Sequence, residues 1–353
     1  MKLIEKYVNE GIISGAPADL LLANGGDPCV LRPFIGADGR SYVTHRRPDG
    51  TYEAVLTNAN ATLRKDEWKL LDDAVIKAAK ERLRLVDDLR GAGLTFNIPQ
   101  GMGKTVLETE AQSDINAAVI SMDGLREAPG DRPEYSLTNL PLPITHKDFQ
   151  FSARQILASR NGGSPLDTTM AELAARKVAE QIEKLCIGVL DSYTFGGGTV
   201  YGLVNYPHRL TQTLTDPTDS NWTGATLLSE VIAMRTASIN AKHYGPWVLY
   251  VAPAWDAYLD EDYKDYSDVT VRDRIKAVNG INDIRTLDFL EDYDMVLVQQ
   301  SSDVIRLVIG KDITTLQWDT KGGMQKNFKV MAIMVPQVRC DFNSNTGIVH
   351  GSV

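Results

Sequence analysis

The sequence lacks the patterns that mark most catalytic and metal-binding sites. It contains only three cysteines, Cys29, Cys186 and Cys340, which lie far apart and match no metal-ligand spacing. The five histidines are scattered and form neither H-x-x-x-H nor H-E-x-x-H, and no G-x-S-x-G nucleophile motif occurs. We therefore expect buried free thiols and a protein that is not an enzyme, with no catalytic residues, no metal site and no cofactor.

The sequence also has no long apolar run and no excess of basic charge. No stretch of about 18 apolar residues occurs, and charges interrupt the first eleven positions, so we expect no membrane segment and no signal peptide. This favours assembly in a cytosol. The formal net charge of -9 argues against a protein that binds nucleic acid over a broad surface, since such a surface must be basic. It is compatible with an acidic container that repels nucleic acid held inside it.

One short stretch resembles a nucleotide-binding loop. Residues 101–105 read GMGKT, the end of the phosphate-loop motif G-x-x-x-x-G-K-[ST]. The first glycine of that motif would be residue 98, which is Ile98, and Pro99 follows it. The flanking residues predict two short extended pieces rather than a buried strand and a helix. We therefore predict a turn between two strands, with Lys104 as a surface or interface charge.

The N-terminal part of the sequence reads as an arm. With 353 residues, 43% of them hydrophobic, the chain can bury a substantial core and hold two or three subdomains. Residues 1–62, however, are polar and glycine-rich. They predict one β-hairpin, in which residues 41–45 and 51–56 form the strands on either side of turn-forming residues at 46–50. This segment has too little apolar surface to fold alone, so we expect it to lie on something else.

A helix and then an extended hairpin are predicted next. From Thr62 apolar residues recur with helical period until the glycines at 91 and 93. After the GMGKT turn, residues 115–124 and 134–153 read as two long strands around a charged tip at 125–133, rich in proline and glycine. Their alternating polar residues could not all face the core of their own subunit, which indicates a projecting arm that rests on a neighbour.

The second half alternates helices and strands. Residues 169–189 predict a long amphipathic helix with a capping box at Thr169 and Glu172. A compact α/β module follows, with helices at 224–242, 254–263 and 270–278 and buried strands at 247–253 and 295–300. The tail is rich in strands, at 304–310, 313–320 and 327–339, and its last strand must pair with earlier elements. This predicts a subdomain built from distant segments.

An acidic run, Asp260-Glu261-Asp262 with Asp265 and Asp268, could in principle hold calcium. It lacks the glycine and the terminal glutamate of a calcium loop, so a solvated helix end is favoured. Three tyrosines, at 258, 263 and 266, interleave with these acids. The run therefore also fits an intersubunit contact patch.

The order of elements resembles the major capsid proteins of tailed bacteriophages, which have the Hong Kong 97 fold, a fold shared with the encapsulin nanocompartments. Four stretches are similar to the encapsulin-like branch: the tryptophan-led helix at 66–83, the GMG turn at 101–103, the passage into the long helix at 147–189, and the strand pair at 307–318. The resemblance covers residues 63 to 345. Two departures weaken the cargo-loading role of encapsulins: Gln181-Ile182-Glu183 replaces the usual Glu-Asp, and more than sixty residues precede the tryptophan.

The resemblance implies an α+β, Hong Kong 97-like capsid fold. The divisions it implies are an N-terminal arm (1–62), the first part of a peripheral domain (63–114), an extended loop (115–160), the spine helix of the peripheral domain (161–199), an axial α/β domain (200–302) and returning strands of the peripheral domain (303–353).

Contact residues between subunits follow from the same resemblance. Arg126, Glu127, Asp131, Arg132 and Glu134 at the hairpin tip would form complementary charge pairs with a neighbour, which set register more than affinity. Asp260, Glu261 and Asp262 would lie at a symmetry axis or on an outer or inner face.

The implied function is structural. The chain would be a phage major head protein that self-assembles, as pentamers and hexamers, into an icosahedral capsid around double-stranded DNA, without sequence-specific binding. Its partners would be other copies of itself, a portal, and scaffold or decoration proteins, and its location the virion, assembled in the host cytoplasm. The alternatives are an encapsulin-like shell that encloses an enzyme cargo, or an enzyme whose site leaves no recognisable motif.

Overall fold

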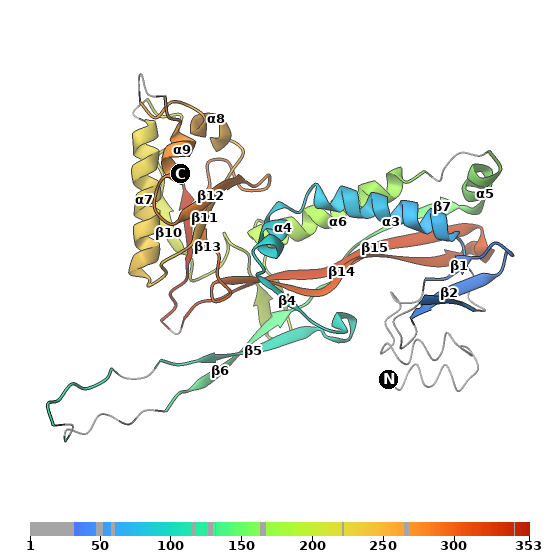
Figure 1. Ribbon diagram of the computed structural model, residues 1–353, viewed down its shortest axis with the longest axis horizontal. Coiled ribbons are helices and arrows are strands. Elements are labelled where there is room, and N and C mark those ends of the chain that lie inside the picture. The colour runs from blue at the N-terminus through green and yellow to red at the C-terminus, as the bar shows by residue number, and fades with distance from the viewer. Residues whose placement is uncertain are drawn as a thin grey trace.

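The computed structural model describes residues 32–46, 52–57, 61–114, 117–123, 125, 130, 132–162, 167–220, 222–264, 268–341 and 343–353. The molecule has three parts (Figure 1): a long peripheral part of helices on strands, an upright α/β module at one end of it, and a hairpin that projects beyond them. The sequence-based expectations for residues 1–31, Cys29 included, lie outside the described residues.

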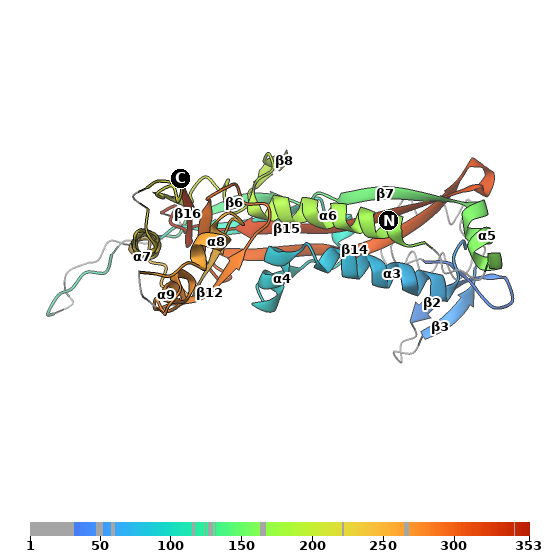
Figure 2. The ribbon, with the colours of Figure 1, turned by 90° about the horizontal axis from the view of Figure 1, so that it is seen from above.

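The peripheral part is built on a four-stranded sheet. Its strands follow the order β4-β14-β15-β7, namely β4 (Thr95–Asn97), β14 (Ile305–Thr320), β15 (Gln325–Val338) and β7 (Thr145–Ser152). Helices α3 (Lys65–Lys80) and α6 (Thr169–Ile187) lie side by side on one face of this sheet (Figure 2). Helix α5 (Ala153–Gly162) follows β7 at the far end. The predicted subdomain of distant segments is thus confirmed, because β14 and β15 from the tail pair with β4 and β7.

Helix α6 confirms the predicted spine helix. Its apolar stripe is buried against α3 and the sheet, and the helix ends at Gly188, whose φ of 93° is the left-handed conformation that glycine adopts without strain. The predicted capping box does not form: the N-cap residue is Thr168, one residue earlier than predicted, and its side chain makes no hydrogen bond to the backbone of the first turn. The hydroxyl of Thr168, not Thr169, bonds to Glu172 at 2.8 Å.

The single helix predicted from Thr62 to Gly91 is wrong in its continuity. The chain forms two helices, α3 and α4 (Arg84–Gly91), with a break at 81–83. Leu83 at the break has φ -93° and ψ 68° and is buried. The break allows α4 to turn away from α3 and present Leu85, Val86 and Leu89 to the core.

The upright module contains a five-stranded sheet in the order β10-β16-β13-β11-β12. These strands are β10 (Leu210–Thr213), β16 (Ile348–Ser352), β13 (Met295–Gln299), β11 (Trp247–Val251) and β12 (Ile281–Thr286). Its helices are α7 (Gly224–Asn240), α8 (Trp255–Leu259) and α9 (Val271–Lys276). The predicted α/β module is therefore present. The sequence-based prediction did not include β16, which brings the last residues of the chain into this sheet rather than into the peripheral one.

The projecting hairpin differs from the prediction. Its strands are β5 (Val106–Gln112) and β6 (Tyr135–Pro141). Residues 117–123, predicted as its first strand, contain no strand. Residues 145–152, predicted as part of its second strand, form β7 and pair with β15 instead. The physical reason is Pro143, which separates the two runs, and Phe149 and Phe151, which are buried in the peripheral core.

Smaller elements complete the fold. The N-terminal hairpin prediction is confirmed by β2 (Ser41–Arg46) and β3 (Tyr52–Leu56), which pair with each other, while β1 (Phe34–Ile35) pairs with β2 on its other side. The chain before β1 is tied to α3 because the Trp68 indole N–H donates to the Pro33 carbonyl at 3.2 Å. A second short hairpin, β8 (Tyr193–Phe195) with β9 (Gly198–Val200), follows α6.

The GMGKT segment is a turn, as predicted. Its first three residues form a 3₁₀ turn, η1 (Gly101–Gly103), between β4 and β5. A second 3₁₀ turn, η2 (Lys321–Gly323), joins β14 to β15. One continuous apolar core joins the peripheral part to the upright module, and a smaller cluster lies under the base of the projecting hairpin.

Candidate assembly surfaces

The β5–β6 hairpin is a two-stranded ribbon that leaves the body of the molecule (Figure 1). The strands pair without a bulge from Val106 opposite Pro141 to Gln112 opposite Tyr135. At the middle of the ribbon the hydroxyls of Thr109 and Thr138 are 2.8 Å apart. An isolated two-stranded ribbon is marginal in water, so this one needs support at its base or from another molecule.

The base of the hairpin is fixed by close backbone contacts. The Asn139 side-chain amide donates to the Gly196 carbonyl at 3.0 Å, and the Leu142 N–H donates to the Thr105 carbonyl at 2.9 Å. A Cβ added to Gly198 would lie 2.0 Å from the carbonyl oxygen of Asn139. The β8–β9 turn therefore sits directly on β6, and the hairpin leaves the body in a defined direction.

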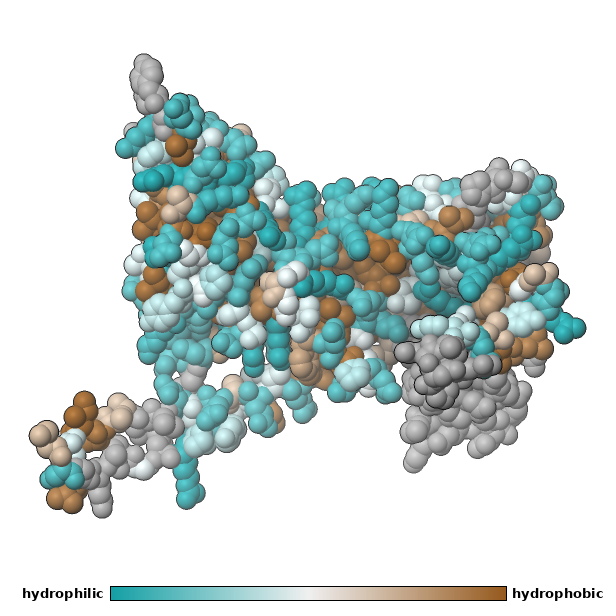
Figure 3. Space-filling view, in the orientation of Figure 1, coloured by the Kyte–Doolittle hydropathy of each residue, from teal (hydrophilic) through white to brown (hydrophobic). Residues whose placement is uncertain are grey.

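The described residues at the far end of the hairpin include several exposed apolar side chains. Ile120, Met122 and Leu125 are 96%, 106% and 82% exposed, so no described part of the chain covers them. Tyr135 and Leu137 on β6 are also exposed. Figure 3 shows apolar side chains gathered at this end, separated from the rest of the surface by the length of the ribbon. Exposed apolar groups clustered in this way mark interaction surfaces.

The charged residues predicted at the tip are only partly described. Arg126, Glu127 and Asp131 lie outside the described residues. Arg132 and Glu134 are exposed, and the backbone N–H of Glu134 donates to the Ser113 hydroxyl at 2.8 Å, which closes the ribbon just beyond β5 and β6. The sequence-based prediction assigned contacts between subunits to these charges and not to the apolar residues beside them. The signal was present, because three large apolar residues lie at 120, 122 and 125 in an otherwise polar segment.

The acidic run at 260–262 sits at the end of α8 and before α9. Asp260 is engaged within its own chain, since its carboxylate accepts from Arg272 at 2.7 Å, and Arg272 also contacts Asp256 at 2.6 Å. Glu261 and Asp262 have exposed side chains. Their stretch is fixed through the backbone, where Val271 N–H donates to the Glu261 carbonyl at 3.0 Å. Glu261 and Asp262 therefore form an exposed acidic edge beside Asp260. In the described part of the chain, no group of acidic, histidine and cysteine side chains could hold a metal ion.

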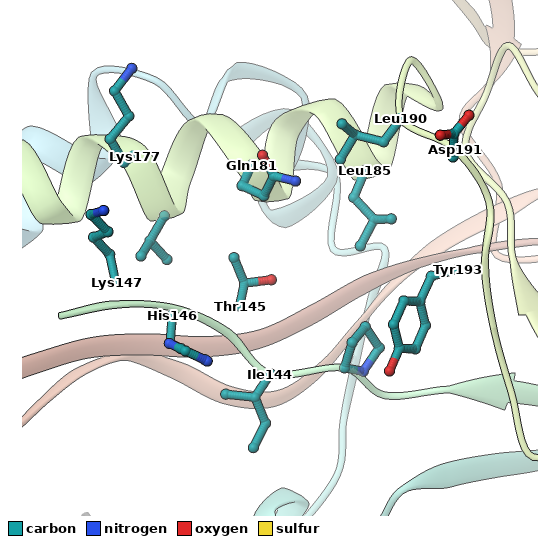
Figure 4. Close-up of a pocket in the computed structure, with 12 residues that line it drawn as sticks. Ile144, Thr145, His146, Lys147, Lys177, Gln181, Leu185, Leu190, Asp191 and Tyr193 are labelled. Atoms are coloured by element: carbon teal, nitrogen blue, oxygen red, sulfur yellow. The ribbon is translucent and has the colours of Figure 1, made fainter.

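A groove of about 670 Å³ lies between α6 and β7 (Figure 4). Ile144, Thr145 and His146 line it from the start of β7, and Gln181 and Leu185 face it from α6. Its remaining lining residues are Pro143, Lys147, Lys177, Val178, Leu190, Asp191 and Tyr193. Strand β7 is an edge strand of the peripheral sheet, so its outer backbone groups are not used by the described strands. The groove is a second surface suited to contact with another polypeptide.

The joint between the peripheral part and the upright module is charged. We define it as α4 and the residues of β11, β12 and the following loop that face α4. Arg285 of β12 pairs with Asp88 of α4 and, at 3.0 Å, with Asp283. Asp288 lies 3.2 Å from Arg84 and 3.6 Å from Arg82. These pairs link α4 and the residues before it to the upright module.

None of the described helices is long and apolar enough to cross a membrane. The exposed hairpin end, the acidic run and the groove are the candidate assembly surfaces among the described residues.

A family model and an encapsulin shell protein match this sequence. A family model described as a family of unknown function (DUF6260) matches residues 58–351. The type 1 encapsulin shell protein of Myxococcus xanthus (strain DK1622) is 26% identical over 217 residues, which cover 59% of this chain and 68% of that protein.

Two solved structures show the same architecture at low sequence identity. A virus-like particle from Pyrococcus furiosus superposes with a TM-score of 0.56 at 16% identity, over 81% of this chain and 99% of that one. The capsid of Myoviridae phage XM1 superposes with a TM-score of 0.56 at 12% identity, over 70% of this chain and 85% of that one. The expected α+β, Hong Kong 97-like fold is therefore confirmed.

Proposed function

The chain belongs to the family of unknown function DUF6260. From its fold and its projecting hairpin, we propose that it is a shell protein that assembles with copies of itself. The observation that carries the proposal is the β5–β6 hairpin. It leaves the body of the molecule and ends in apolar side chains that no described part of the chain covers.

A second copy of the chain is the simplest cover for this surface. A hairpin that lies on a neighbour makes a head-to-tail contact, and such contacts form rings when the rotation between copies closes on itself and open filaments when it does not. The contacts at the base of the hairpin and the ion pairs of the joint would help to set that rotation. A closed shell would need many such interfaces, each burying on the order of 1,000 Å² of surface, and it would form only when all of them are made.

The finer proposal is a major capsid protein of a tailed bacteriophage. In this reading the shell is an icosahedral head around double-stranded DNA, assembled in the host cytoplasm, with a portal and with scaffold or decoration proteins. The long N-terminal lead supports it, since encapsulins have a short one, and the net charge of -9 fits a container that does not bind its DNA tightly.

A second candidate is an encapsulin-like shell that encloses an enzyme. The 26% identity to the type 1 encapsulin shell protein of Myxococcus xanthus favours it. In either reading the chain itself carries no catalytic role.

The module limits and the contact residues are part of the proposal. In place of the expected limits 115–160 and 303–353, we assign residues 106–141 to the extended loop, 63–105, 142–199 and 303–341 to the peripheral domain, and 200–302 together with β16 to the axial domain. Arg132 and Glu134 on the hairpin, and Glu261 and Asp262 on the acidic turn, are exposed and remain candidates for contacts between copies.

The contents of purified particles distinguish the two candidates. Particles from the natural source that hold double-stranded DNA and one portal vertex support the phage capsid. Particles that hold a protein cargo and no DNA support the nanocompartment and overturn the finer proposal.

A further inference from the structure

The first turn of α4 is capped by a side chain from another helix. A helix leaves its first backbone N–H groups without partners, and a side chain at its own N-terminus usually satisfies one of them. The residue before α4 is Leu83, which has no such group. Instead the carboxylate of Glu183, on α6, accepts from the Leu85 N–H at 2.6 Å.

This cap is buried. Glu183 is 2% exposed, and Leu85 and Val86 are fully buried. A carboxylate removed from water is costly unless hydrogen bonds and opposite charge compensate for the loss of hydration. Here the compensation is incomplete, because one oxygen accepts from the first turn of a short helix while Oε2 is buried without a hydrogen-bond partner among the described residues. The closed position of α4 is therefore sensitive to whether Glu183 carries a charge.

Helix α4 is also the element that ties the peripheral part to the upright module. Asp88 on its outer side pairs with Arg285 of β12 and contacts the hydroxyl of Tyr250 on β11. Glu183 therefore holds α4 from one side, and the upright module holds it from the other. Any local opening of α4 must loosen both attachments.

We propose that Glu183 and α4 form a proton-operated clamp at the joint, tight when Glu183 is protonated and weakened when Glu183 is ionised. The clamp is a property of the single chain and does not depend on shell assembly. Within a shell, where the angle between the two modules decides how copies meet, it would make the subunit stiffer at acid pH than at alkaline pH.

The electrostatic surroundings favour the protonated form. Burial raises the pKa of Glu183 to about 7, the carboxylates of Asp88 and Asp87 add to the rise, and the backbone N–H groups of Leu85 and Val86 oppose it. The charged and titratable groups around the clamp are Cys186 on α6, Asp87 and Asp88 on α4, Arg82 and Arg84 at its start, Tyr250 on β11, and Asp283 and Arg285 on β12. The two acids on α4 lie next to the clamp, and Arg285 pairs with Asp88 rather than with Glu183.

The direction of the pH effect follows from linkage. When α4 opens, Glu183 meets water and its pKa returns toward the ordinary value of 4.5. Between pH 4.5 and 7 the closed form therefore holds a proton that the open form releases, so closure weakens as the pH rises through this window. For these two values the opening equilibrium rises about 30-fold between pH 5.5 and 8.5.

Amide hydrogen exchange of the full-length chain tests the clamp. After correction for intrinsic exchange rates, opening of the α4 amides in the wild type should increase at least about tenfold from pH 5.5 to 8.5. In Glu183→Gln, whose amide oxygen can accept from Leu85 but never ionises, opening should not change with pH. Glu172→Gln makes the same change on the same helix away from α4 and should follow the wild type.

Two results would overturn the proposal: a wild-type profile that changes less than threefold, or an equal pH dependence in Glu183→Gln. If Glu183→Gln does not fold, difference infrared spectroscopy of the wild type decides. A buried carboxyl band that titrates near pH 7 supports the clamp, and the absence of any carboxyl that titrates above pH 6 contradicts it. Neither the exchange measurement nor the infrared measurement requires particles to form, so failure of the clamp and failure of the proposed shell function are distinguishable.

Discussion

Gly101 packs directly against Gly310, so that a Cβ built on Gly101 would lie 2.1 Å from the carbonyl oxygen of Gly310. This contact holds the η1 turn on β14 and thus positions the strand that starts the projecting hairpin. The segment that resembles a phosphate loop in sequence therefore has a packing role. Its first glycine is needed for a close approach between two backbones.

The first prediction concerns this contact. Gly101→Ala should destabilise the folded chain by about 1–3 kcal/mol, because the new methyl group forces two backbones apart. Gly103→Ala is the matched control, since a Cβ at Gly103 meets no atom within 4 Å. Urea unfolding of both variants measures the difference. Equal stability of the two variants would show that the turn can move at little cost.

The second prediction concerns the far end of the hairpin. Replacing Ile120, Met122 and Leu125 together by serine should leave the free energy of unfolding of the single subunit unchanged, because these side chains are already exposed. If a neighbour covers them, assembly loses their burial, and the concentration needed for assembly should rise at least about tenfold.

Light scattering across a concentration series measures this effect. Met324→Ser, an exposed apolar side chain at the β14–β15 turn, is the control for a general loss of apolar surface. Normal assembly of the triple variant would show that these three side chains are not part of the interface.

The third prediction concerns pH and the ion pair that holds α5 to α3. The Arg160 guanidinium donates twice to Glu67, at 2.8 and 2.7 Å, and both side chains are largely buried. Burial alone would raise the pKa of Glu67, but the hydrogen bonds from Arg160 and from the Arg64 N–H outweigh it and lower that pKa. A lowered folded-state pKa stabilises the folded chain above the ordinary value of 4.5 and loses that effect as the pH falls through the folded-state value.

Arg160→Met should therefore cost about 2 kcal/mol at pH 7, because Glu67 loses its charged partner. The difference from the wild type should shrink at acid pH, where Glu67 is protonated in both proteins. Thermal unfolding from pH 3 to 7 measures it. Arg154→Met, an exposed position near the start of α5, is the control. A cost for Arg160→Met that does not vary with pH would mean that packing of the arginine stem, not its charge, stabilises the contact.

The sequence could predict the elements whose signals are local. The spine helix α6 and helix α7 both carry regular apolar stripes and caps, and the turn at 101–103 is marked by its glycines. The resemblance to capsid proteins then supplied the fold, which no single motif could have done.

Non-local contacts explain the errors. The start of α4 after the break is capped by Glu183, 98 residues beyond Leu85 in the chain. The division of 134–153 between β6 and β7 depends on β15, a partner far along the sequence. The place of β16 in the upright sheet is likewise fixed by β10 and β13. Periodicity within each segment contains no information on these partners.

The candidate surfaces show the same limit. The charges at the hairpin tip and the acidic run could be seen in the sequence, but only the structure shows that Asp260 pairs with Arg272 and that Ile120 and Met122 are uncovered. Whether a side chain is free for a neighbour depends on what its own chain places beside it.

Electron microscopy of the purified full-length chain, combined with its sedimentation profile, tests the central claim most directly. The proposed function predicts closed shells of uniform diameter built from copies of this one chain. A protein that remains monomeric under every assembly condition tried would contradict it.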